Sequence, residues 1–269
     1  MSDTALADAL TRRGHRVRHA AWNDAPLAEF TTADLVILRS NWDYHHSLSA
    51  FETWLDDVER SDVELRNPAE LVRAYLDKAY LDHLVAAGFR TPRTLVAAEL
   101  DGDDVLEWVD TNQLDRVVVK PAWGASGHGV ELASRADLPE IGRRWRQSST
   151  RRPMLVQEFI PEVAAGECAL IFFRGEFSHA LRRQPVEGEF RVNSQYGGTT
   201  TWWSDVDPSV VEFGRKVEAT LPEVATYARI DVVPNSDGHV VMEVEINEPG
   251  LGLNLAPGAG ERFADALLN

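Results

Sequence analysis

The sequence predicts an α/β (α+β) fold in which a small N-terminal domain with a parallel sheet precedes a larger part with antiparallel strands. Helical and strand-forming segments alternate near the N-terminus, which is typical of small parallel sheets. Later segments form predicted hairpins, such as Arg229–Val233 followed by Val241–Asn247. Between these parts, the β-prone segment Arg116–Lys120 leads into a glycine-rich loop. These three observations define the fold class.

The composition indicates a globular protein of one large or two small domains. Its 269 residues are 44% hydrophobic and 26% charged, which is enough for a substantial core. The net charge of −16 argues against general binding to nucleic acid or anionic membranes, because both need a positive surface field. The single Cys168 excludes an intramolecular disulfide and is interpreted as an inert thiol. No membrane span or leader pattern is recognisable, so we expect a cytoplasmic protein.

The N-terminal elements follow from apolar spacing and from helix-ending residues. Leu6, Ala9 and Leu10 form the apolar stripe of a helix that ends at Gly14. The chain therefore opens in a helix, with no strand before it. The next elements are expected as strands at His15–His19 and Leu35–Leu38, a helix at Leu48–Glu59, an extended segment at Val63–Asn67 and a helix that starts at Pro68.

The loop Arg39–Tyr44 is a candidate substrate-binding loop. It follows the predicted strand Leu35–Leu38, and ligand-binding loops of open α/β sheets leave the C-terminal ends of strands. A surface turn with an anchoring tryptophan is the alternative.

The remaining elements are separated by clear turn signals, among them Gly88 after a helix and Arg174-Gly175 within a hairpin. They are expected as a helix at Asp77–Ala87, a strand at Arg93–Ala97, a helix at Asp103–Thr111, strands at Arg116–Lys120 and Val130–Ala133, a helix from Leu138 to about Ser148, a strand at Met154–Phe159, a hairpin over Gly166–Arg182, and helices at Pro208–Leu221 and Ala259–Leu267.

The last predicted hairpin gathers metal-type ligands on one face. Side chains alternate across a strand, so Glu243, Glu245 and Asn247 point to one side. A three-residue loop at Ser236–Gly238 sets Asp231 opposite Glu243, and Arg229 opposite Glu245. Such an acid–acid pair costs roughly 0.2–1 kcal/mol unless a cation lies between the carboxylates. Mg²⁺ with nucleotide phosphates fits this face; a solvated polar strand face is the alternative.

The segment after Lys120 has the composition of a phosphate-binding loop. Ala122–Val130 contains three glycines and a serine within six residues, which lets backbone N–H groups approach phosphate oxygens closely. It is not a Walker A loop, because its lysine precedes the glycines, and it does not open a helix as a dinucleotide fingerprint does. The alternative is that Lys120 is an ordinary surface lysine whose methylene stem is buried.

The order of several motifs resembles that of ATP-grasp ligases. The motifs are Lys78, Lys120 with its glycine-rich loop, Gln157–Ile160, Gly166-Glu167, Arg191 with Asn193 and Gly197-Gly198, then Asp231, Glu245 and Asn247. The metal strand Glu245-Ile246-Asn247 is similar to that of bacterial glutathione synthetase. Arg39–Tyr44, Asn67-Pro68 and Phe190–Val192 look like the branch that contains the cycloserine-forming cyclo-ligase (O-ureido-serine cyclo-ligase). The match spans roughly residues 35–260.

The resemblance implies an ATP-grasp fold, divided into a substrate-side domain (1–75), a central lid subdomain (76–159) and a C-terminal subdomain with the metal site (160–269). It implies ATP and one or two Mg²⁺ ions as cofactors. The implied nucleotide-binding residues are Lys78, Lys120, Ser126, Gly127, His128, Gly129, Gln157, Glu158, Phe159, Ile160, Glu167 and Arg182. Arg191 and Arg229 are implied to be catalytic, and Asp231, Glu245 and Asn247 to be metal ligands. We place Glu243 in a supporting role, and expect Arg39, Asn41, Asp43, Tyr44 and Trp203 to contact substrate.

Other interpretations accompany some of these residues. The alternative interpretation of Arg182-Arg183 is a pair of solvated surface charges. The alternative interpretation of Trp202-Trp203 is packing in the core. We interpret His128 as an incidental polar residue of the lid. A role as general acid is the alternative. The pair His45-His46 has no third ligand at metal spacing, so we do not expect zinc.

One departure from the family concerns the N-terminus. ATP-grasp relatives begin with a strand, whereas this chain starts in the following helix, so we expect either a late start codon or a sheet that lacks its first strand. The second case leaves an open edge for a second copy, and hence a homodimer.

These residues together predict an enzyme. We expect an ATP-dependent carboxylate–amine ligase that forms an amide or cyclic amide from a small amino-acid-like substrate through an acyl phosphate. The alternatives are a nucleotide-binding regulatory or partner protein that has lost catalysis, and an ATP-grasp phosphotransferase. The partners we expect are small-molecule carboxylate and amine substrates, without nucleic acid or membrane.

Overall fold

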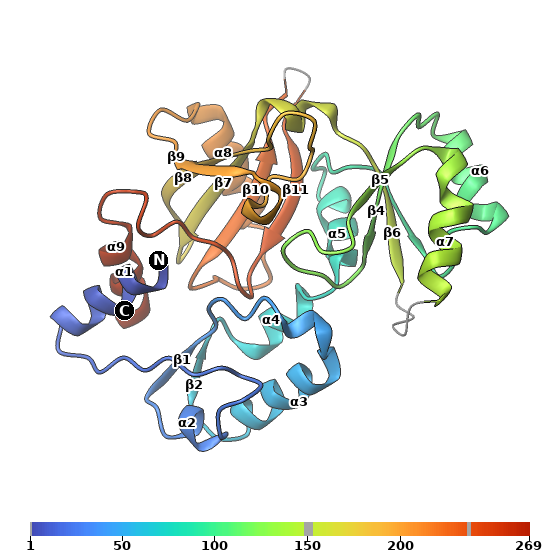
Figure 1. Ribbon diagram of the computed structural model, residues 1–269. Helices are drawn as coiled ribbons and strands as arrows, with labels where there is room; N and C mark the ends of the chain where they lie inside the picture. The colour runs from blue at the N-terminus through green and yellow to red at the C-terminus, as the bar shows by residue number, and fades with distance from the viewer. Residues whose placement is uncertain (1, 148–152, 236–237) are drawn as a thin grey trace.

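The computed structural model describes residues 2–147, 153–235 and 238–269, and its strands form three sheets (Figure 1). The parallel two-stranded sheet consists of β1 (Leu35–Ile37) and β2 (Glu64–Arg66). The antiparallel four-stranded sheet has the order β3 (Thr94–Ala97), β6 (Met154–Glu158), β4 (Val117–Pro121) and β5 (Glu131–Ala133). The antiparallel five-stranded sheet has the order β11 (Val240–Glu245), β10 (Ala228–Val233), β7 (Glu167–Phe173), β8 (Glu176–Gln184) and β9 (Thr199–Trp202). The predicted mixed α/β class is confirmed.

Helices flank each sheet, mostly where apolar spacing predicts them. The α-helices are α1 (Ser2–Arg12), α2 (Ala28–Thr31), α3 (Leu48–Glu59), α4 (Ala69–Ala74), α5 (Leu81–Ala86), α6 (Asp103–Thr111), α7 (Leu138–Gln147), α8 (Pro208–Glu218) and α9 (Ala259–Leu268). Short 3-10 helices are η1 (Tyr44–His46), η2 (Lys78–Tyr80), η3 (Arg135–Asp137), η4 (Pro161–Ala165) and η5 (Ser194–Tyr196). The expected end of α7 at Ser148 lies outside the described residues.

The predicted strand at His15–His19 is wrong. This segment is without regular secondary structure and is mostly exposed, so its alternating pattern has no sheet to join. The N-terminal sheet instead has β1 and β2 alone among the described residues, covered by α3, whose Phe51, Leu55 and Val58 are fully buried.

Helix α1 packs against α9, so the two ends of the chain meet on one side of the molecule (Figure 1). Its apolar stripe, Leu6, Ala9 and Leu10, is buried in a core cluster with Phe263 of α9 and Leu181 of β8. The first helix is therefore buried against the five-stranded sheet, although in sequence it precedes the N-terminal sheet.

The five-stranded sheet contains the predicted hairpin, with the expected register at its site end. Asp231 lies opposite Glu243, and Arg229 opposite Glu245, while a bulge follows Asp231. Of the predicted turn, Ser236 and Asp237 lie outside the described residues. The opposite face of this sheet packs on α8 through residues such as Leu170 and Ile230. One face is thus packed against α8, whereas the face that carries Asp231 is shared between the site and the core cluster with α1 and α9.

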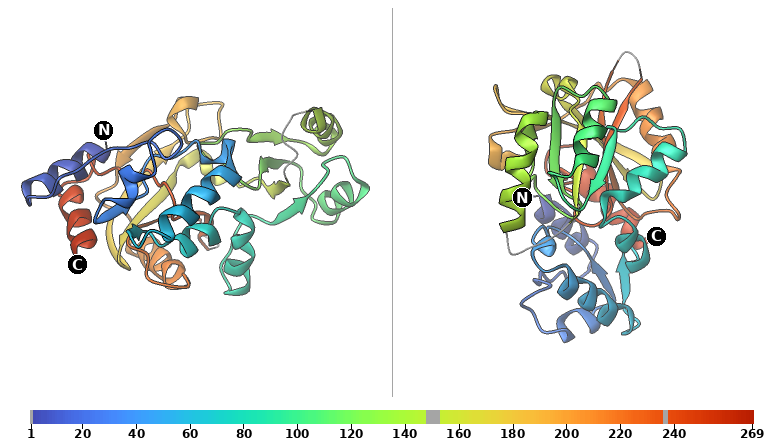
Figure 2. Two further views of the ribbon diagram at one scale, coloured as in Figure 1. Left: turned by 90° about the horizontal axis from the view of Figure 1, so that it is seen from below. Right: turned by 90° about the vertical axis from the view of Figure 1, so that its right-hand side faces the viewer.

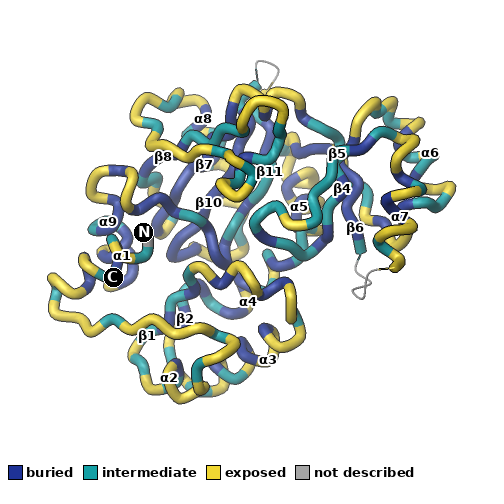
Figure 3. Tube along the Cα trace, in the orientation of Figure 1, coloured by how far each residue is buried: buried dark blue, intermediate teal, exposed yellow. Residues whose placement is uncertain are grey.

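Seen from below, the molecule is elongated, with α6 and α7 at one end and α1 and α9 at the other (Figure 2). Strands β7 and β10 are buried along their length, whereas the outer faces of the peripheral helices are exposed (Figure 3). Among the described residues, no helix has the length and apolarity needed to cross a membrane.

Candidate active site

A cavity of about 400 Å³ lies where the three sheets and their connecting loops face one another. Its walls combine Trp42 of the N-terminal part, Lys120 of the four-stranded sheet and Asp231 of the five-stranded sheet. This volume is typical of small-molecule sites. The predicted site residues that line it are Tyr44, Lys78, Lys120, Ser126, Gly127, His128, Gln157, Glu158, Phe159, Ile160, Glu167, Arg191, Arg229, Asp231, Glu245 and Asn247.

Three carboxylates converge on the floor of the cavity. Asp231, Glu243 and Glu245 each offer an oxygen, and these oxygens all lie within 4.8 Å of one another. The antiparallel register produces this arrangement, because residues opposite each other in β10 and β11 project from the same face of the sheet. Asp231 is almost completely buried, at 1% side-chain exposure.

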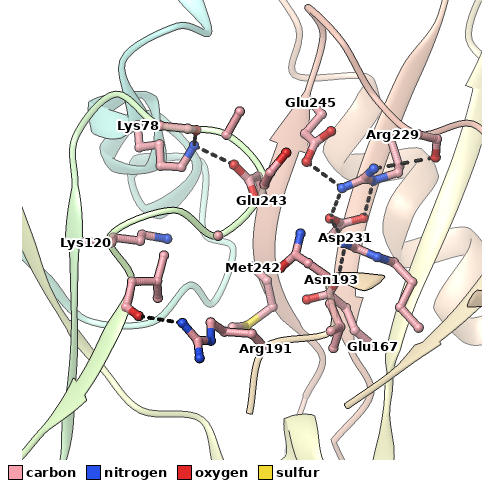
Figure 4. Close-up of a pocket in the computed structure, with 18 of the residues that line it drawn as sticks. Lys78, Lys120, Glu167, Arg191, Asn193, Arg229, Asp231, Met242, Glu243 and Glu245 are labelled. Atoms are coloured by element: carbon pink, nitrogen blue, oxygen red, sulfur yellow. Dashed lines mark hydrogen bonds and ion pairs between the residues drawn. The ribbon is translucent and has the colours of Figure 1, made fainter. Parts of the chain in front are cut away.

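Basic side chains surround the acid cluster (Figure 4). Nε and Nη2 of Arg229 each donate to an oxygen of Asp231 at 2.8 Å, and Nη2 also contacts Glu245. Nζ of Lys78 lies 2.6 Å from Oε1 of Glu243. The three carboxylates are therefore held by cations from β10 and from η2, on opposite sides of the cavity.

The acids of the site are not neutralised equally. Burial, reinforced by Glu243 and Asp231, raises the pKa of Glu245 to about 7. Burial and the neighbouring Asp231 raise the pKa of Glu167 to about 8. Glu243 behaves differently, because Lys78 and Lys120 overcome the effect of burial and hold its pKa at about 2. A further cation near Glu245 would relieve this repulsion.

The site fits a hard divalent cation. Its converging ligands are all oxygens, as Mg²⁺ prefers, and the acids face one another at short range. Asn247 lines the same cavity and has a buried Nδ2 without a hydrogen-bond partner among the described residues. An amide in this position can satisfy its polar atoms by turning its oxygen to a cation.

Lys78 and Lys120 approach the cavity from two different elements. Lys78 follows Asp77, whose side chain accepts from the backbone N–H of Ala79 and fixes the start of η2. Lys120 lies near the end of β4, and burial lowers the pKa of its ammonium group to about 8. Opposite charge from Glu243 instead raises the pKa of Lys78 despite burial. Both groups are suited to an anionic ligand.

The glycine-rich loop is fastened to a segment that precedes β9. The hydroxyl of Tyr196 donates to the carbonyl of Gly127 at 3.1 Å, and Gln195 donates to the carbonyl of Ser126. Arg191 donates to the carbonyl of Val130 at 3.3 Å, and its guanidinium stacks 3.5 Å from the centre of the Tyr196 ring. The loop is therefore held closed over the cavity.

Gly129 lies outside the cavity wall, contrary to the sequence expectation, whereas Arg191 lines the cavity and has further partners. Gly129 does not line the cavity, since its α-carbon faces the Trp145 ring and Pro121. Arg191 lines the cavity, and its guanidinium is also held by Glu189, with Nη2 to Oε2 at 2.7 Å.

The structure places Arg183, and not Arg182, in the cavity. Neighbouring strand residues point to opposite faces, and Arg183 shares the face of Glu167 and Asp231, which it contacts at 2.7 and 2.9 Å. Arg182 lies on the other face, with its guanidinium over the ring of Trp203. Trp203 itself packs against the core cluster on that side. The expected placement of Arg182 and Trp203 at the site is corrected accordingly.

The loop Arg39–Tyr44 reaches the site. Most of its residues that were expected to contact substrate instead contact other parts of the protein. Arg39 pairs with Asp3 of α1 and donates to the carbonyl of Pro249 at 2.8 Å. Asp43 accepts from Trp22 and Asn23 at the surface. Asn41 donates to the side chain of Asn247 at 3.0 Å. Arg39, Asn41 and Asp43 are thus outside the cavity wall, because hydrogen bonds to distant segments hold them.

Several lining residues were not predicted. Trp42 lies at the cavity edge and is held there by a bond from its Nε1 to the carbonyl of Glu248. Tyr75 and Glu248 also line the wall, as does Asn193, which was named in a family motif but given no role. Strand alternation would have indicated Arg183. The others lie in loops or just outside a helix, where no periodic pattern marks a direction.

Two family models match the chain. The N-terminal domain of D-cycloserine synthetase DcsG matches residues 1–67, and the prokaryotic glutathione synthetase ATP-grasp domain matches residues 82–254. The second match alone covers more than half of the chain, and the two follow one another without overlap.

Similar proteins agree with these matches. The cycloserine biosynthesis protein DcsG of Streptomyces lavendulae is 28% identical over 91% of this chain and 86% of its own. A glutathione synthetase of Prochlorococcus marinus is 30% identical over 64% of this chain and 53% of its own. The crystal structure of D-cycloserine synthetase DcsG superposes with a TM-score of 0.84 at 25% identity, covering 98% of this chain and 92% of that one.

Proposed function

Because the chain belongs to the prokaryotic glutathione synthetase family of ATP-grasp proteins, and is an ATP-dependent carboxylate–amine ligase, we propose that it acts on a small amino-acid-like substrate. The substrate carboxylate is activated as an acyl phosphate and then joined to an amine, as an amide or cyclic amide. The observation that carries this proposal is the convergence of Asp231, Glu245 and Asn247 with Lys78 and Lys120 in one cavity.

ATP would lie between the two larger sheets. Lys78 and Lys120 supply positive charge for its phosphates, and the loop Ser126–Gly129 covers them. The segment Glu158–Ile160 offers main-chain groups to the adenine edge, while Glu167 lies toward the ribose. This assignment is supported by the presence of all these segments at one cavity, although Gly129 contributes only backbone shape.

Asp231, Glu245 and Asn247 would hold one or two Mg²⁺ ions. Bound there, the metal would neutralise the negative charge that develops during phosphoryl transfer. The protein's own contribution is to keep these ligands converged, with Arg229 and Arg183 holding Asp231 in place. Glu243 is committed to Lys78 and supports the site from there.

The chemistry then needs charge and position more than a protein nucleophile. A substrate carboxylate oxygen attacks the γ-phosphorus of ATP, and ADP departs. The amine nitrogen next attacks the acyl carbon and loses a proton, the bond from that carbon to the bridging oxygen breaks, and inorganic phosphate departs with that oxygen. Arg229, whose pKa is raised by Asp231 and Glu245 against the effect of burial, stays charged throughout. Arg191, which lines the cavity beside the glycine-rich loop, would neutralise charge on the transferring group.

Two observations support a small substrate. The substrate has to share one cavity with the nucleotide, since the residues that we assign to both line the same space. The likeness to the crystal structure of a protein named for D-cycloserine synthesis extends along nearly the whole chain, and the family model of that protein's N-terminal domain matches residues 1–67, the part that contributes Trp42 and Tyr44 to the cavity.

The direct test is to measure ADP release with Mg·ATP and a panel of amino-acid-like carboxylates, with and without hydroxylamine as a replacement amine. We expect ADP release that depends on both Mg²⁺ and a carboxylate, together with a hydroxamate when hydroxylamine is present. Product mass separates the two forms of the reaction. Loss of one water from a single substrate indicates ring closure, and loss of one water from the sum of two substrates indicates coupling.

Two results would contradict the proposal. A stable phosphorylated product that hydroxylamine does not intercept indicates a phosphotransferase. Tight ATP binding without turnover over the whole panel indicates a nucleotide-binding protein that has lost catalysis. The variant Glu245→Gln controls for contaminating ATPases, because it should remove the substrate-dependent release.

A further inference from the structure

The side chains of Asn41 and Asn247 form a buried amide pair between the N-terminal part and the metal strand. Asn41 is 7% exposed and Asn247 is 4% exposed, and Nδ2 of Asn41 donates to Oδ1 of Asn247 at 3.0 Å. Among the described residues, neither Oδ1 of Asn41 nor Nδ2 of Asn247 has a hydrogen-bond partner. Two buried polar atoms are thus left unsatisfied, which is costly unless a ligand completes them.

The loop around Asn41 is anchored to the metal-carrying segment on both sides. Arg39 donates to the carbonyl of Pro249 at 2.8 Å, and Trp42 donates to the carbonyl of Glu248 at 3.0 Å. Asn41 lies between them and contacts the side chain of Asn247, while the other two contact only backbone carbonyls of that segment. This geometry holds the two amides in register and makes Asn41 the one member of the three that can orient Asn247.

The pair has a second arrangement with the same internal hydrogen bond. If both amides turn by 180°, Nδ2 of Asn247 donates to Oδ1 of Asn41, and Oδ1 of Asn247 takes the place of the unpartnered nitrogen. An amide nitrogen cannot ligate a cation, whereas an amide oxygen can. The turned arrangement therefore replaces an unsatisfied donor at the cavity wall by an oxygen that a cation satisfies.

We propose that Asn41 is a positioning residue for the metal site, which turns together with Asn247 so that Asn247 presents Oδ1 to the cation. This inference rests on the proposed metal site and adds a link between the N-terminal part and that site. Asn41 acts through Asn247 and does not touch substrate.

The test measures Mn²⁺ binding to the ADP-saturated protein by electron paramagnetic resonance, with ADP binding measured separately without metal. Asn41→Leu removes the side-chain group that hydrogen-bonds to the Asn247 amide in either arrangement, and we expect Mn²⁺ affinity to fall at least about tenfold, the usual effect of losing a group that orients a metal ligand. ADP affinity without metal should be unchanged. Asn41→Asp can only accept, so it keeps Nδ2 of Asn247 as donor and should retain Mn²⁺ affinity within a few-fold or improve it.

Ser40→Ala is the matched control. It removes the neighbouring bond from Ser40 to Asp3 without touching Asn247, so Mn²⁺ affinity should stay within about twofold. The control separates the orientation of Asn247 from general loosening of the loop. If Asn41→Leu does not fold, the comparison of Asn41→Asp with wild type decides: a loss of affinity in that variant contradicts the turned arrangement.

Other outcomes overturn distinct parts of the argument. Unchanged Mn²⁺ affinity in Asn41→Leu, with a raised KM for the substrate alone, means that Asn41 contacts substrate, and only this inference fails. Absence of Mn²⁺ binding by the wild-type ADP complex removes the proposed metal site itself, and this inference with it.

Discussion

The ammonium group of Lys78 lies 2.6 Å from Oε1 of Glu243, so the carboxylate at the centre of the acid cluster already has a partner from across the cavity. Glu245 pairs instead with Arg229 on the neighbouring strand. The two glutamates share one strand face and one cavity, yet they have opposite pKa shifts, to about 2 for Glu243 and about 7 for Glu245. This difference separates Glu243, which holds the lysine that we propose to bind phosphate, from Glu245, whose charge is less fully neutralised.

Glu245→Gln should abolish turnover with little effect on the fold. The amide keeps the size of the side chain but weakens the attraction for Mg²⁺, so we expect kcat to fall by roughly 10²-fold or more. Thermal unfolding should change little, because removing a charge from a repulsive cluster costs little stability. Glu176→Gln, at a side chain 85% exposed, is the control. Wild-type activity of Glu245→Gln at limiting Mg²⁺ would show that Glu245 is not a ligand.

Glu243→Gln should affect ATP binding more than metal binding. Loss of the carboxylate leaves Lys78 buried with a weaker partner, so its ammonium group is held less firmly. We expect KM for ATP to rise several-fold, in parallel with the effect of Lys78→Met, while the Mg²⁺ concentration for half-maximal rate changes less than twofold. Steady-state kinetics over a matrix of ATP and Mg²⁺ concentrations measures both. A large shift in Mg²⁺ dependence would instead make Glu243 a ligand.

Tyr196→Phe should weaken closure of the glycine-rich loop. The substitution deletes the bond to the carbonyl of Gly127, while the ring that stacks on Arg191 remains. A single hydrogen bond of this kind contributes about 1 kcal/mol, so KM for ATP should rise roughly five-fold, with a smaller change in kcat. Equal ATP kinetics in wild type and variant would mean that the contact does not form when nucleotide is bound.

Gly127→Ala should damage the same loop more severely than Tyr196→Phe. Gly127 has φ +70°, a conformation unfavourable for alanine, and an added Cβ would lie 2.9 Å from Oδ1 of Asn193. We expect a larger rise in KM for ATP with unchanged thermal stability, because the loop borders the cavity and is outside the buried core. Gly188→Ala is a matched control, since it also has a positive φ but has open space around its Cβ position.

His179 should make stability depend on pH. It is 4% exposed and its Nε2 lies 2.8 Å from the carbonyl of Leu251, while burial lowers its pKa from 6.5 to about 4. Above pH 6.5 the imidazole of His179 is neutral in both the folded and the unfolded chain. Between pH 6.5 and 4 the unfolded chain takes up the proton first, so the free energy of unfolding falls by about 3 kcal/mol in total.

Denaturant titrations across this pH range, on wild type and His179→Gln, measure the effect. The variant should show a shallower fall, because glutamine does not titrate. His83→Gln, at an exposed position of α5, should retain the wild-type slope. Identical slopes for wild type and His179→Gln would contradict the assignment to His179.

The sequence by itself determined most of the elements and one face of the site. Apolar spacing predicts α3, α6 and α9 to within a residue, because the buried stripe of a helix is a local property. Alternation also sets Glu243 and Glu245 on one side of β11, since successive side chains of a strand point to opposite faces. Their predicted partners Asp231 and Arg229 are confirmed, although a bulge after Asp231 shifts the register nearer the turn. These features need only neighbouring residues.

The tertiary structure alone decided what each loop residue contacts. Nothing local shows that Arg39 pairs with Asp3, that Asn41 meets Asn247, or that α1 packs on α9, because these partners are far apart in the sequence. The exposed segment His15–His19 has a strand-like pattern, and only the absence of a described partner strand shows that it is no strand. Long-range packing therefore determines which polar residues form contacts within the protein and which line the cavity.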